Sequence, residues 1–424
     1  MFREDGFNFM QFGGLGRLAI GLVDSAGGVK RPLGPSVDLS ARVSGSQVGA
    51  CRLLEGLCHV SGIGRGRTVC RMICRPRADM RPPTQEPPTM QAQAIAAAAP
   101  AQENLEPIWL NARQGQLARA VVMARPCDFA FNEQTGADNV FQHRLQLPAA
   151  EVTALALAEF DAMAQRLRNH GVEVLVLEKS PDGYPTPDAV FPNNWFSTSV
   201  DGSLHVYPMH TLNRRRERRV EELCQLLLSH GYEVEQVVWA GPPQEEELIL
   251  EGTGVMVFDH PRKRVYAARS QRCHPSALYR YARRRGLEAV HLFDTVDSRG
   301  VPIYHTNVMM SVGEGFAVIC SESLHRPEQR RQVLSALSEH HEVIDISLAQ
   351  VERSFCGNIL QLRGAGGQPL IAMSEQAWNG FTSAQQRVLE RHGQPVVNPI
   401  PTIEAVGGGS CRCMLAEVFL PRIR

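Results

Sequence analysis

Beyond residue 108, apolar and polar residues follow one another in a succession that predicts alternating helices and strands. Residues 151–170 carry apolar side chains at helical spacing and end at Gly171, a residue type that commonly closes a helix. The apolar run 172–177 then predicts a strand. Further elements are expected as a first strand at 117–123, helices at 216–230, 277–286 and 384–393, and a strand at 232–234. This repetition predicts an α/β fold.

Five short polar turns, each followed by an apolar strand, interrupt this part of the chain. They span residues 191–196, 250–257, 304–310, 355–360 and 409–415. Aligned on Asn194, Gly254, Asn307, Asn358 and Arg412 or Cys413, they recur about every 50–60 residues, the spacing of a repeated supersecondary unit. Strand–turn–helix units without symmetry are common in α/β proteins, so their succession alone does not establish a repeat. The prediction rests on the reactive residues that lie inside the turns. Five units around one axis would bring Asn, Glu, His and Cys side chains together.

The last of these turns contains the clearest candidate for a nucleophile. Three successive glycines at 407–409 allow positive φ angles and a close approach of backbone N–H groups to a ligand. Cys413 follows where the chain becomes apolar again, which would place its thiol at the floor of a pocket. Taken alone, the segment is equally compatible with a glycine-rich turn beside a buried structural cysteine.

Glu251 and His305 lie in two other turns and would complete a catalytic set with Cys413. A cysteine and a histidine form a nucleophile with a proton shuttle, and a carboxylate would bind a nitrogen-rich substrate and stabilise positive charge on it. Each residue has a simpler explanation by itself, because the chain has 14 histidines and Glu251 follows an acidic run typical of a solvated surface. Their common position in three turns favours the catalytic interpretation.

The composition of the chain bears on its partners and on its cellular compartment. Lys plus Arg and Asp plus Glu number 44 each, so the net charge points neither to nucleic acid nor to a membrane surface as a partner. No apolar run reaches membrane-spanning length. The 11 cysteines are scattered and odd in number, which predicts a reducing compartment, the cytoplasm.

The first 105 residues differ from the rest of the chain. They are rich in Gly, Arg, Ala and Pro with weak periodicity, so we predict a low-order, disordered arm and linker over 1–105 and one catalytic domain over 106–424. The arm contains four cysteines and a histidine whose spacings do not match a usual zinc pattern, and we predict no metal site there. These residues are Cys51, Cys58, His59, Cys70 and Cys74.

The turns resemble those of the guanidino-group-modifying superfamily, the penteins, which includes arginine deiminases, dimethylarginine hydrolases and amidinotransferases. Residues 250–252 are similar to the family's Glu-Gly turn, 304–307 to its His turn and 408–413 to its terminal Cys loop. The resemblance covers about residue 115 to the end and is nearest to the citrulline-utilisation hydrolase branch. It implies a five-bladed, pseudo-symmetric α/β propeller and covalent catalysis by the three residues above, without a metal or an organic cofactor.

The same resemblance supplies candidates for binding the substrate's α-carboxylate. Residues 270–272 resemble a segment whose arginine binds that group, which implies this role for Arg272. Arg214 lies in a segment similar to the family's Arg-Arg-x-Glu sequence and is the second candidate. An exposed ion pair on the surface is the alternative for Arg214.

Asn194 and Asn307 stand where arginine deiminases carry aspartates. Two carboxylates suit a cationic guanidinium, whereas an amide, with a donor and an acceptor, suits a neutral ureido group. We therefore predict that citrulline is hydrolysed to ornithine, ammonia and carbon dioxide. Asp188 would supply a missing carboxylate if the protein were instead an arginine deiminase or a dimethylarginine hydrolase.

A second alternative is a non-catalytic binding protein of pentein fold, which would need no Cys–His pair. The expected partner is a small-molecule amino acid, with no nucleic acid and no membrane, and the sequence leaves open whether the protein forms a homo-oligomer. Cys413, His305 and Glu251 together favour the enzyme.

Overall fold

The computed structural model describes residues 114–136, 139–179, 183–241 and 248–423, together with the backbone of six strands between residues 2 and 73. The chain divides into two compact units, Met1–Thr89 and Met90–Arg424. Apart from the six strands, the arm predicted over 1–105 lies outside the described residues, as does its boundary with the catalytic domain.

The first unit contains two three-stranded sheets, ordered β1-β2-β3 and β4-β6-β5, in which every pairing is antiparallel. The strands are β1 (Phe2–Glu4), β2 (Phe7–Phe12), β3 (Leu15–Ile20), β4 (Ser36–Ala41), β5 (His59–Val60) and β6 (Thr68–Ile73).

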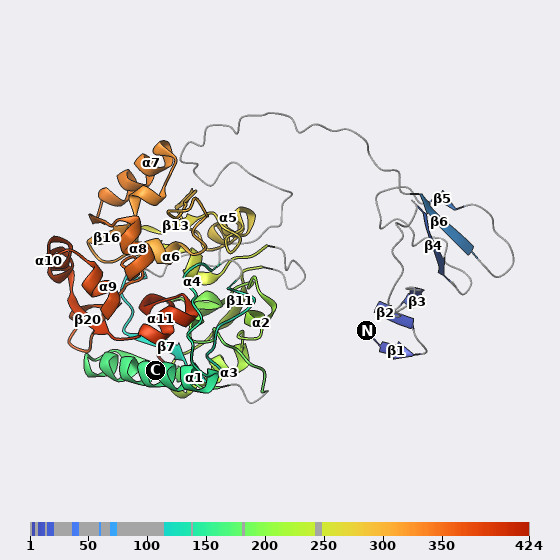
Figure 1. Ribbon diagram of the computed structural model, residues 1–424, viewed down its shortest axis with the longest axis horizontal. Helices are drawn as coiled ribbons and strands as arrows, with labels where there is room; N and C mark the ends of the chain where they lie inside the picture. Colours follow the sequence, from blue (N-terminus) through green and yellow to red (C-terminus); the bar gives the residue numbers. More distant parts are fainter. Residues whose placement is uncertain are drawn as a thin grey trace. The chain divides into compact units, whose positions relative to one another are not determined.

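The second unit repeats one supersecondary pattern five times, which confirms the predicted pseudo-symmetric α/β propeller (Figure 1). Each repeat is a three-stranded sheet whose central strand pairs antiparallel with one neighbour and parallel with the other. The sheets are β21 (Ala416–Val418), β7 (Ala120–Ala124), β8 (Glu173–Leu177); β11 (Gln236–Trp239), β10 (Ser203–Val206), β9 (Phe196–Thr198); β12 (Val257–Asp259), β13 (Arg264–Ala268), β14 (Ala289–Phe293); β15 (Met310–Val312), β16 (Phe316–Ile319), β17 (Glu342–Asp345); and β18 (Leu360–Arg363), β19 (Pro369–Ser374), β20 (Gln394–Asn398).

Long helices make the parallel crossovers, and short ones form the turns between blades. In Figure 1 the short helices α4, α6 and α11 lie near the centre of this unit, and α1, α5, α7 and α10 lie at its periphery. The helices are α1 (Ala149–Asn169), α2 (Leu212–Arg215), α3 (Val220–Ser229), α4 (Gly252–Val255), α5 (Pro275–Arg284), α6 (Thr306–Met309), α7 (Pro327–Ser338), α8 (Leu348–Ser354), α9 (Glu375–Gly380), α10 (Ser383–His392) and α11 (Pro401–Gly407), with 3-10 turns η1 (Pro192–Asn194), η2 (His260–Arg262), η3 (Ser321–Ser323) and η4 (Cys411–Met414).

The five predicted turns all occupy the same place in their blades. Each directly precedes the edge strand that pairs antiparallel with the centre of its sheet, namely β9, β12, β15, β18 or β21. These edge strands contact one another around the axis, as β21 does with β9 and β15 does with β12 and β18. The ring of inner strands therefore gathers the turn residues, as the repeat predicts.

Most expected elements lie within a few residues of their predicted bounds, but two predictions were wrong in detail. The helix expected from residue 216 begins at Val220, after a separate short helix α2. The strand expected at 232–234 is β11, at Gln236–Trp239, while Tyr232 forms only an isolated bridge with Arg422. The reason is burial: Tyr232 packs into the core outside a strand, whereas three of the four β11 side chains are exposed.

Candidate active site

A small cavity at the centre of the propeller brings together six of the eight predicted site residues. They come from four separate turns and helix α2. The cavity is lined by Thr135, Asn139, Asp188, Phe191, Asn194, Arg214, Arg272, Tyr304, His305, Gly407, Gly409 and Cys413. The other two predicted residues, Glu251 and Asn307, contact His305 and Cys413 directly.

His305 is held by Glu251 on the wall formed by α4 and α6. The Nε2 atom of His305 lies 2.7 Å from Glu251 Oε2, and both side chains are buried. Because an ionised carboxylate only accepts hydrogen bonds, Nε2 carries the proton and Nδ1 is left to accept one. Burial lowers the pKa of His305, although the Glu251 carboxylate opposes this shift. The resting imidazole is therefore neutral and suited to act as a base.

Arg272 and a backbone amide also bind the Glu251 carboxylate. Arg272 Nη1 lies 3.2 and 3.3 Å from its two oxygens, and the N–H of His210 donates to Oε1 at 2.9 Å. Burial opposes ionisation of Glu251, but Arg272 and His305 outweigh it and hold the pKa of Glu251 below its usual range. Glu251 thus contacts the candidate base directly, and its role in holding the substrate stays a prediction.

Cys413 lies in η4 among neutral amides. The Nδ2 atom of Asn358 is 3.2 Å and that of Asn307 3.4 Å from the sulfur, and the N–H of Cys413 donates to the carbonyl oxygen of Ser410. Burial raises the pKa of the Cys413 thiol, and the amide contacts only partly offset this effect. The candidate nucleophile is therefore a buried thiol that lines the same cavity as the neutral imidazole of His305.

Asn194 presents an amide donor to the cavity, and Arg214 fixes that orientation. Arg214 Nη1 donates to Asn194 Oδ1 at 2.8 Å, and since a guanidinium can only donate, the facing atom must be the amide oxygen. The opposite atom, Nδ2, is buried and has no hydrogen-bond partner in the described part of the chain. Gly254 leaves room for it, because a Cβ there would lie 2.3 Å from Nδ2.

Arg214 is buried, which contradicts the alternative of an exposed surface pair. Its Nε and Nη2 atoms bind the Glu217 carboxylate at 2.9–3.2 Å, and Nη2 also donates to the carbonyl oxygen of Phe191 at 3.1 Å. Glu217 raises the pKa of Arg214 above its usual value, against the opposing effect of burial. Arg214 therefore positions Asn194 from behind.

Asp188 presents a carboxylate oxygen to the same cavity. Its Oδ2 accepts from Asn132 Nδ2 at 2.7 Å and from Thr135 Oγ1 at 2.9 Å. Its Oδ1 is buried without a hydrogen-bond partner among the described residues, and burial raises the pKa of this carboxyl group. The residues that line the cavity thus include one unpaired buried amide donor and one unpaired buried carboxylate acceptor among the described residues.

The family of the chain follows from a comparison with known proteins. A family model described as eukaryotic N,N dimethylarginine dimethylhydrolase matches residues 125–420. The chain belongs to this family. Membership places it among the guanidino-modifying hydrolases of the pentein superfamily, enzymes that act on C–N bonds other than peptide bonds.

Solved structures of dimethylarginine dimethylhydrolase-like fold agree with the architecture. The N-terminal domain of ArgZ, an arginine dihydrolase from cyanobacteria solved as a mutant bound to substrate, has a TM-score of 0.54 and 14% identity, over 72% of this chain and 99% of that domain. AgrE in a complex with ornithine and NAD+ has a TM-score of 0.53 and 17% identity, over 71% of this chain and 39% of AgrE.

Full-length ArgZ in its apo form matches with a TM-score of 0.54 and 15% identity. The match covers 72% of this chain and 41% of ArgZ, so the dimethylhydrolase-family chain spans about two fifths of that relative's length. At these identities the likeness shows the fold. No curated protein matches the chain.

Several residues of this dimethylhydrolase-family site were not among the predicted set. Asn358 had been aligned with the other turns, and its recurrence there was the signal for its contact with the sulfur. Glu217 lies in the quoted Arg-Arg-x-Glu segment. Asn132 and Thr135 belong to no repeat, and the sequence contains no local signal for them.

No helix in the described ranges is long and apolar enough to cross a membrane. Within the same ranges no three His, Cys, Asp or Glu side chains are grouped to hold a metal ion. The seven cysteines that the structure describes are free thiols.

Proposed function

We propose that the chain is a cysteine-dependent hydrolase of the ureido group, with citrulline as its substrate and ornithine, ammonia and carbon dioxide as its products. One observation carries the proposal: Asn194 Nδ2 and Asp188 Oδ1 are both buried without a hydrogen-bond partner among the described residues, on two side chains that line one cavity. Their chemistry decides between a neutral and a cationic substrate.

A ureido group matches this pair of atoms. Its carbonyl oxygen accepts a hydrogen bond from Asn194, and its terminal NH₂ donates to Asp188. A guanidinium offers only donors, so it would leave Asn194 Nδ2 facing another N–H group without an acceptor. An unpaired buried donor costs about 1–3 kcal/mol, which disfavours arginine in this orientation.

The proposed reaction uses Cys413 and His305 in two stages. His305 Nδ1 takes the thiol proton as Cys413 Sγ attacks the ureido carbon, and donors such as Asn194 Nδ2 stabilise the oxyanion. The bond from carbon to the ornithine nitrogen breaks, and His305 returns the proton to this amine. Water, deprotonated by His305, then cleaves the S-carbamoyl group from Cys413, and the released carbamate decomposes to ammonia and carbon dioxide.

Arg272 is the proposed partner of the substrate's α-carboxylate, because it lines the cavity and its planar fork fits that group. Arg214 is the weaker candidate for this role, since its guanidinium already binds Glu217 and Asn194. The predicted absence of metal and organic cofactor belongs to this proposal: every step uses side chains of the chain itself.

A substrate panel tests the proposal. Purified protein is incubated with citrulline, arginine, dimethylarginine and agmatine, and ammonia, ornithine and citrulline are measured. We expect ornithine and ammonia from citrulline, with the other three substrates turned over at least about tenfold more slowly, the factor that corresponds to 1.4 kcal/mol. Release of citrulline from arginine or dimethylarginine as the main reaction would refute the proposal.

An Asn194→Asp variant sharpens the test. It exchanges the donor that faces the ligand for an acceptor, so we expect kcat/KM for citrulline to fall and the ratio of arginine to citrulline turnover to rise by about tenfold or more. Asn169→Asp, the same exchange at an exposed position of α1, is the matched control and should leave the ratio unchanged. An unchanged ratio in the Asn194 variant would contradict the assigned role.

Two alternatives have specific support. The Asp188 carboxylate and the family model favour an arginine deiminase or a dimethylarginine hydrolase, and the substrate panel separates these from a citrulline hydrolase. A non-catalytic pentein-fold binding protein would need no thiol beside an oriented imidazole. Labelling with a thiol reagent after mild alkaline treatment, followed by peptide mapping, should find Cys413 modified and citrulline protecting it.

A further inference from the structure

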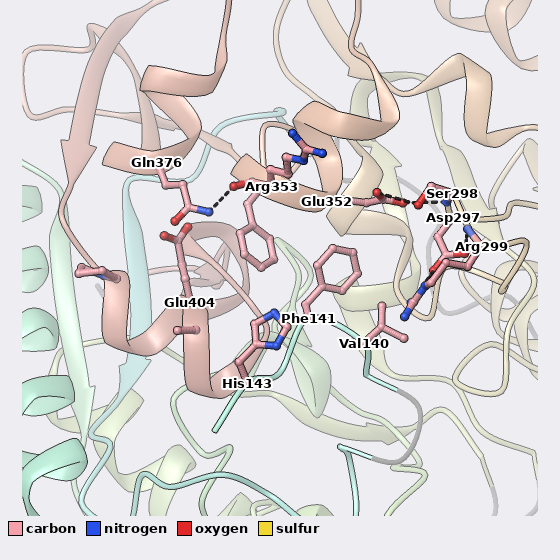
Figure 2. A pocket seen from close by; sticks show the side chains of 13 residues that line it. Val140, Phe141, His143, Asp297, Ser298, Arg299, Glu352, Arg353, Gln376 and Glu404 are labelled. Atoms are coloured by element: carbon pink, nitrogen blue, oxygen red, sulfur yellow. Dashed lines mark hydrogen bonds and ion pairs between the residues drawn. The ribbon is translucent and has the colours of Figure 1, made fainter. Parts of the chain in front are cut away.

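A second cavity, of about 550 Å³, lies beside the nucleophile turn and shares no lining residue with the first (Figure 2). Its walls come from the segment 140–143, the loop 297–299, the end of α8, Gln376 of α9 and helix α11. The proposed reaction uses none of these side chains.

Two carboxylates in this cavity are buried, those of Asp297 and Glu404. Glu404 of α11 is 3% exposed, and in Figure 2 its carboxylate and the Gln376 amide point toward one another. The other two carboxylates of the lining already have partners, since Asp297 binds the Arg299 side chain and Glu352 accepts from Ser298. Glu404 accepts a hydrogen bond from Ser410 Oγ but has no ion pair among the described residues, so it is the buried carboxylate that would recognise a cation.

Two aromatic rings stand beside this carboxylate. The centroids of Phe141 and Phe355, both cavity residues, lie 5.4 Å apart with their planes tilted by 42°. Aromatic faces attract cations and also bury the carbon chain next to them. Figure 2 shows the guanidinium of Arg353 directed away from Glu404. Carboxylate and rings thus form one surface suited to a positive group on an aliphatic stem.

We propose that this cavity binds a small organic cation, an alkylammonium, whose charged head pairs with Glu404 and whose carbon chain packs against Phe141 and Phe355. Burial, with the nearby Glu159 carboxylate adding to it, raises the pKa of Glu404 to about 7. A bound cation favours the ionised carboxylate, so its charge is compensated inside the protein.

Two hydrogen bonds connect this cavity with Cys413 through Ser410. Ser410 Oγ donates to Glu404 Oε1 at 2.6 Å, and the Ser410 carbonyl oxygen accepts from the N–H of Cys413 at 3.0 Å. Above pH 8 Glu404, with a pKa raised by burial to about 7, is already ionised, so a bound cation adds positive charge next to this turn and favours the Cys413 thiolate. Occupancy of the cavity therefore increases the reactivity of Cys413.

The test uses 1,4-diaminobutane as the cation and 1,4-butanediol as its neutral isostere, with isothermal titration calorimetry for binding and iodoacetamide alkylation of Cys413 for coupling. We expect saturable binding of the diamine alone, retained after Cys413 has been alkylated, since the first cavity is then blocked. Saturation with the diamine should accelerate alkylation by about fivefold, a common size of coupling between sites.

Three variants assign the binding to this cavity. Glu404→Gln should weaken diamine binding by about 30-fold or more, because it removes one partner of a buried charge pair. Gln376→Lys tethers an ammonium opposite Glu404 from an exposed position, so it should abolish diamine binding and accelerate alkylation without any ligand. Gln376→Met, neutral and of similar length, should behave as the wild type in both assays.

The inference is overturned if the wild type does not bind the diamine or binds the diol equally well. It is also overturned if alkylation of Cys413 abolishes binding, which would place the diamine in the first cavity. Equal binding of the diamine by the wild type and by Gln376→Lys would also overturn the inference. The Gln376→Lys variant keeps the test decisive if Glu404→Gln fails to fold.

Discussion

The two walls of the active-site cavity use charge in opposite ways. On one wall Arg272, Glu251 and His305 form a continuous buried network, and Arg214 pairs with Glu217 behind it. On the other wall the sulfur of Cys413 contacts the neutral amides of Asn307 and Asn358. The base is oriented by full charges, while the nucleophile contacts only amides.

This difference has a chemical consequence. Ion pairs fix the His305 ring before substrate arrives, which removes the cost of orienting it during the reaction. Amides stabilise a sulfur anion less than a cation does, so burial keeps the resting thiol protonated. The proton must leave Cys413 during the attack, and a neutral ureido substrate suits a site that holds no thiolate in advance.

Removing the nucleophile gives the largest expected effect. Cys413→Ser should lower kcat for the substrate by about 10⁴-fold or more, as loss of a covalent nucleophile does elsewhere, while leaving the fold intact. Cys411→Ala is the matched control two residues away and should keep most of the activity. Steady-state kinetics and circular dichroism measure both, and normal turnover by the Ser variant would rule out covalent catalysis.

Glu251→Gln removes the carboxylate at the centre of the buried network that Arg272, Glu251 and His305 form. Without the carboxylate, His305 loses its fixed orientation and kcat should fall by about 10²–10³-fold. Arg272 is left as a buried charge without that partner, so the free energy of unfolding should decrease by about 3–5 kcal/mol. Asp259→Asn, at a buried carboxylate paired with Arg262, should destabilise the fold without this loss of kcat; equal losses in both variants would assign Glu251 a purely structural role.

The sequence predicted which reactive side chains lie in the turn of each repeat. Cys413, His305, Glu251, Asn194 and Asn307 precede edge strands in four of five similar blades, so local patterns indicated both the propeller and the convergence of these residues. Strand β11 was misplaced to 232–234 because Tyr232 packs into the core without belonging to a strand.

The sequence did not predict which other residues each site residue contacts. Arg272 was expected at the substrate carboxylate, yet it contacts Glu251, 21 positions earlier in the chain. Asp188 is bound by Asn132 and Thr135, more than 50 residues away and outside any repeat. The Asp188 contacts depend on the packing of one blade against the next, and the Arg272 contact depends on how two turns of one blade meet. Turn sequences encode neither.

The pH dependence of Cys413 reactivity tests the amide wall without a mutation. Because burial raises the pKa of Cys413 above its usual value, little thiolate exists at neutral pH, and the fraction grows about tenfold per pH unit below that pKa. Burial also lowers the pKa of His305, so no imidazolium is available to stabilise a thiolate. The rate of iodoacetamide alkylation should therefore rise steadily from pH 7 past pH 9, and a plateau between pH 6 and 8 would reveal a preformed ion pair.

Asn358→Asp places a charge on the neutral wall and should have the smallest effect of the series. The new carboxylate would lie beside the sulfur, where Asn358 Nδ2 now donates at 3.2 Å, so it removes a donor and adds a like charge to the thiolate. The pKa of Cys413 should rise further, and alkylation at pH 8 should slow by about tenfold, the equivalent of one pKa unit. Asn398→Asp makes the same exchange next to Cys411, where the amide nitrogen lies 3.8 Å from the sulfur, and should leave the alkylation of Cys413 unchanged. If the Asn358 variant reacted as fast as the wild type, the amides would not control the thiol, and the contrast between the two walls would rest on burial alone.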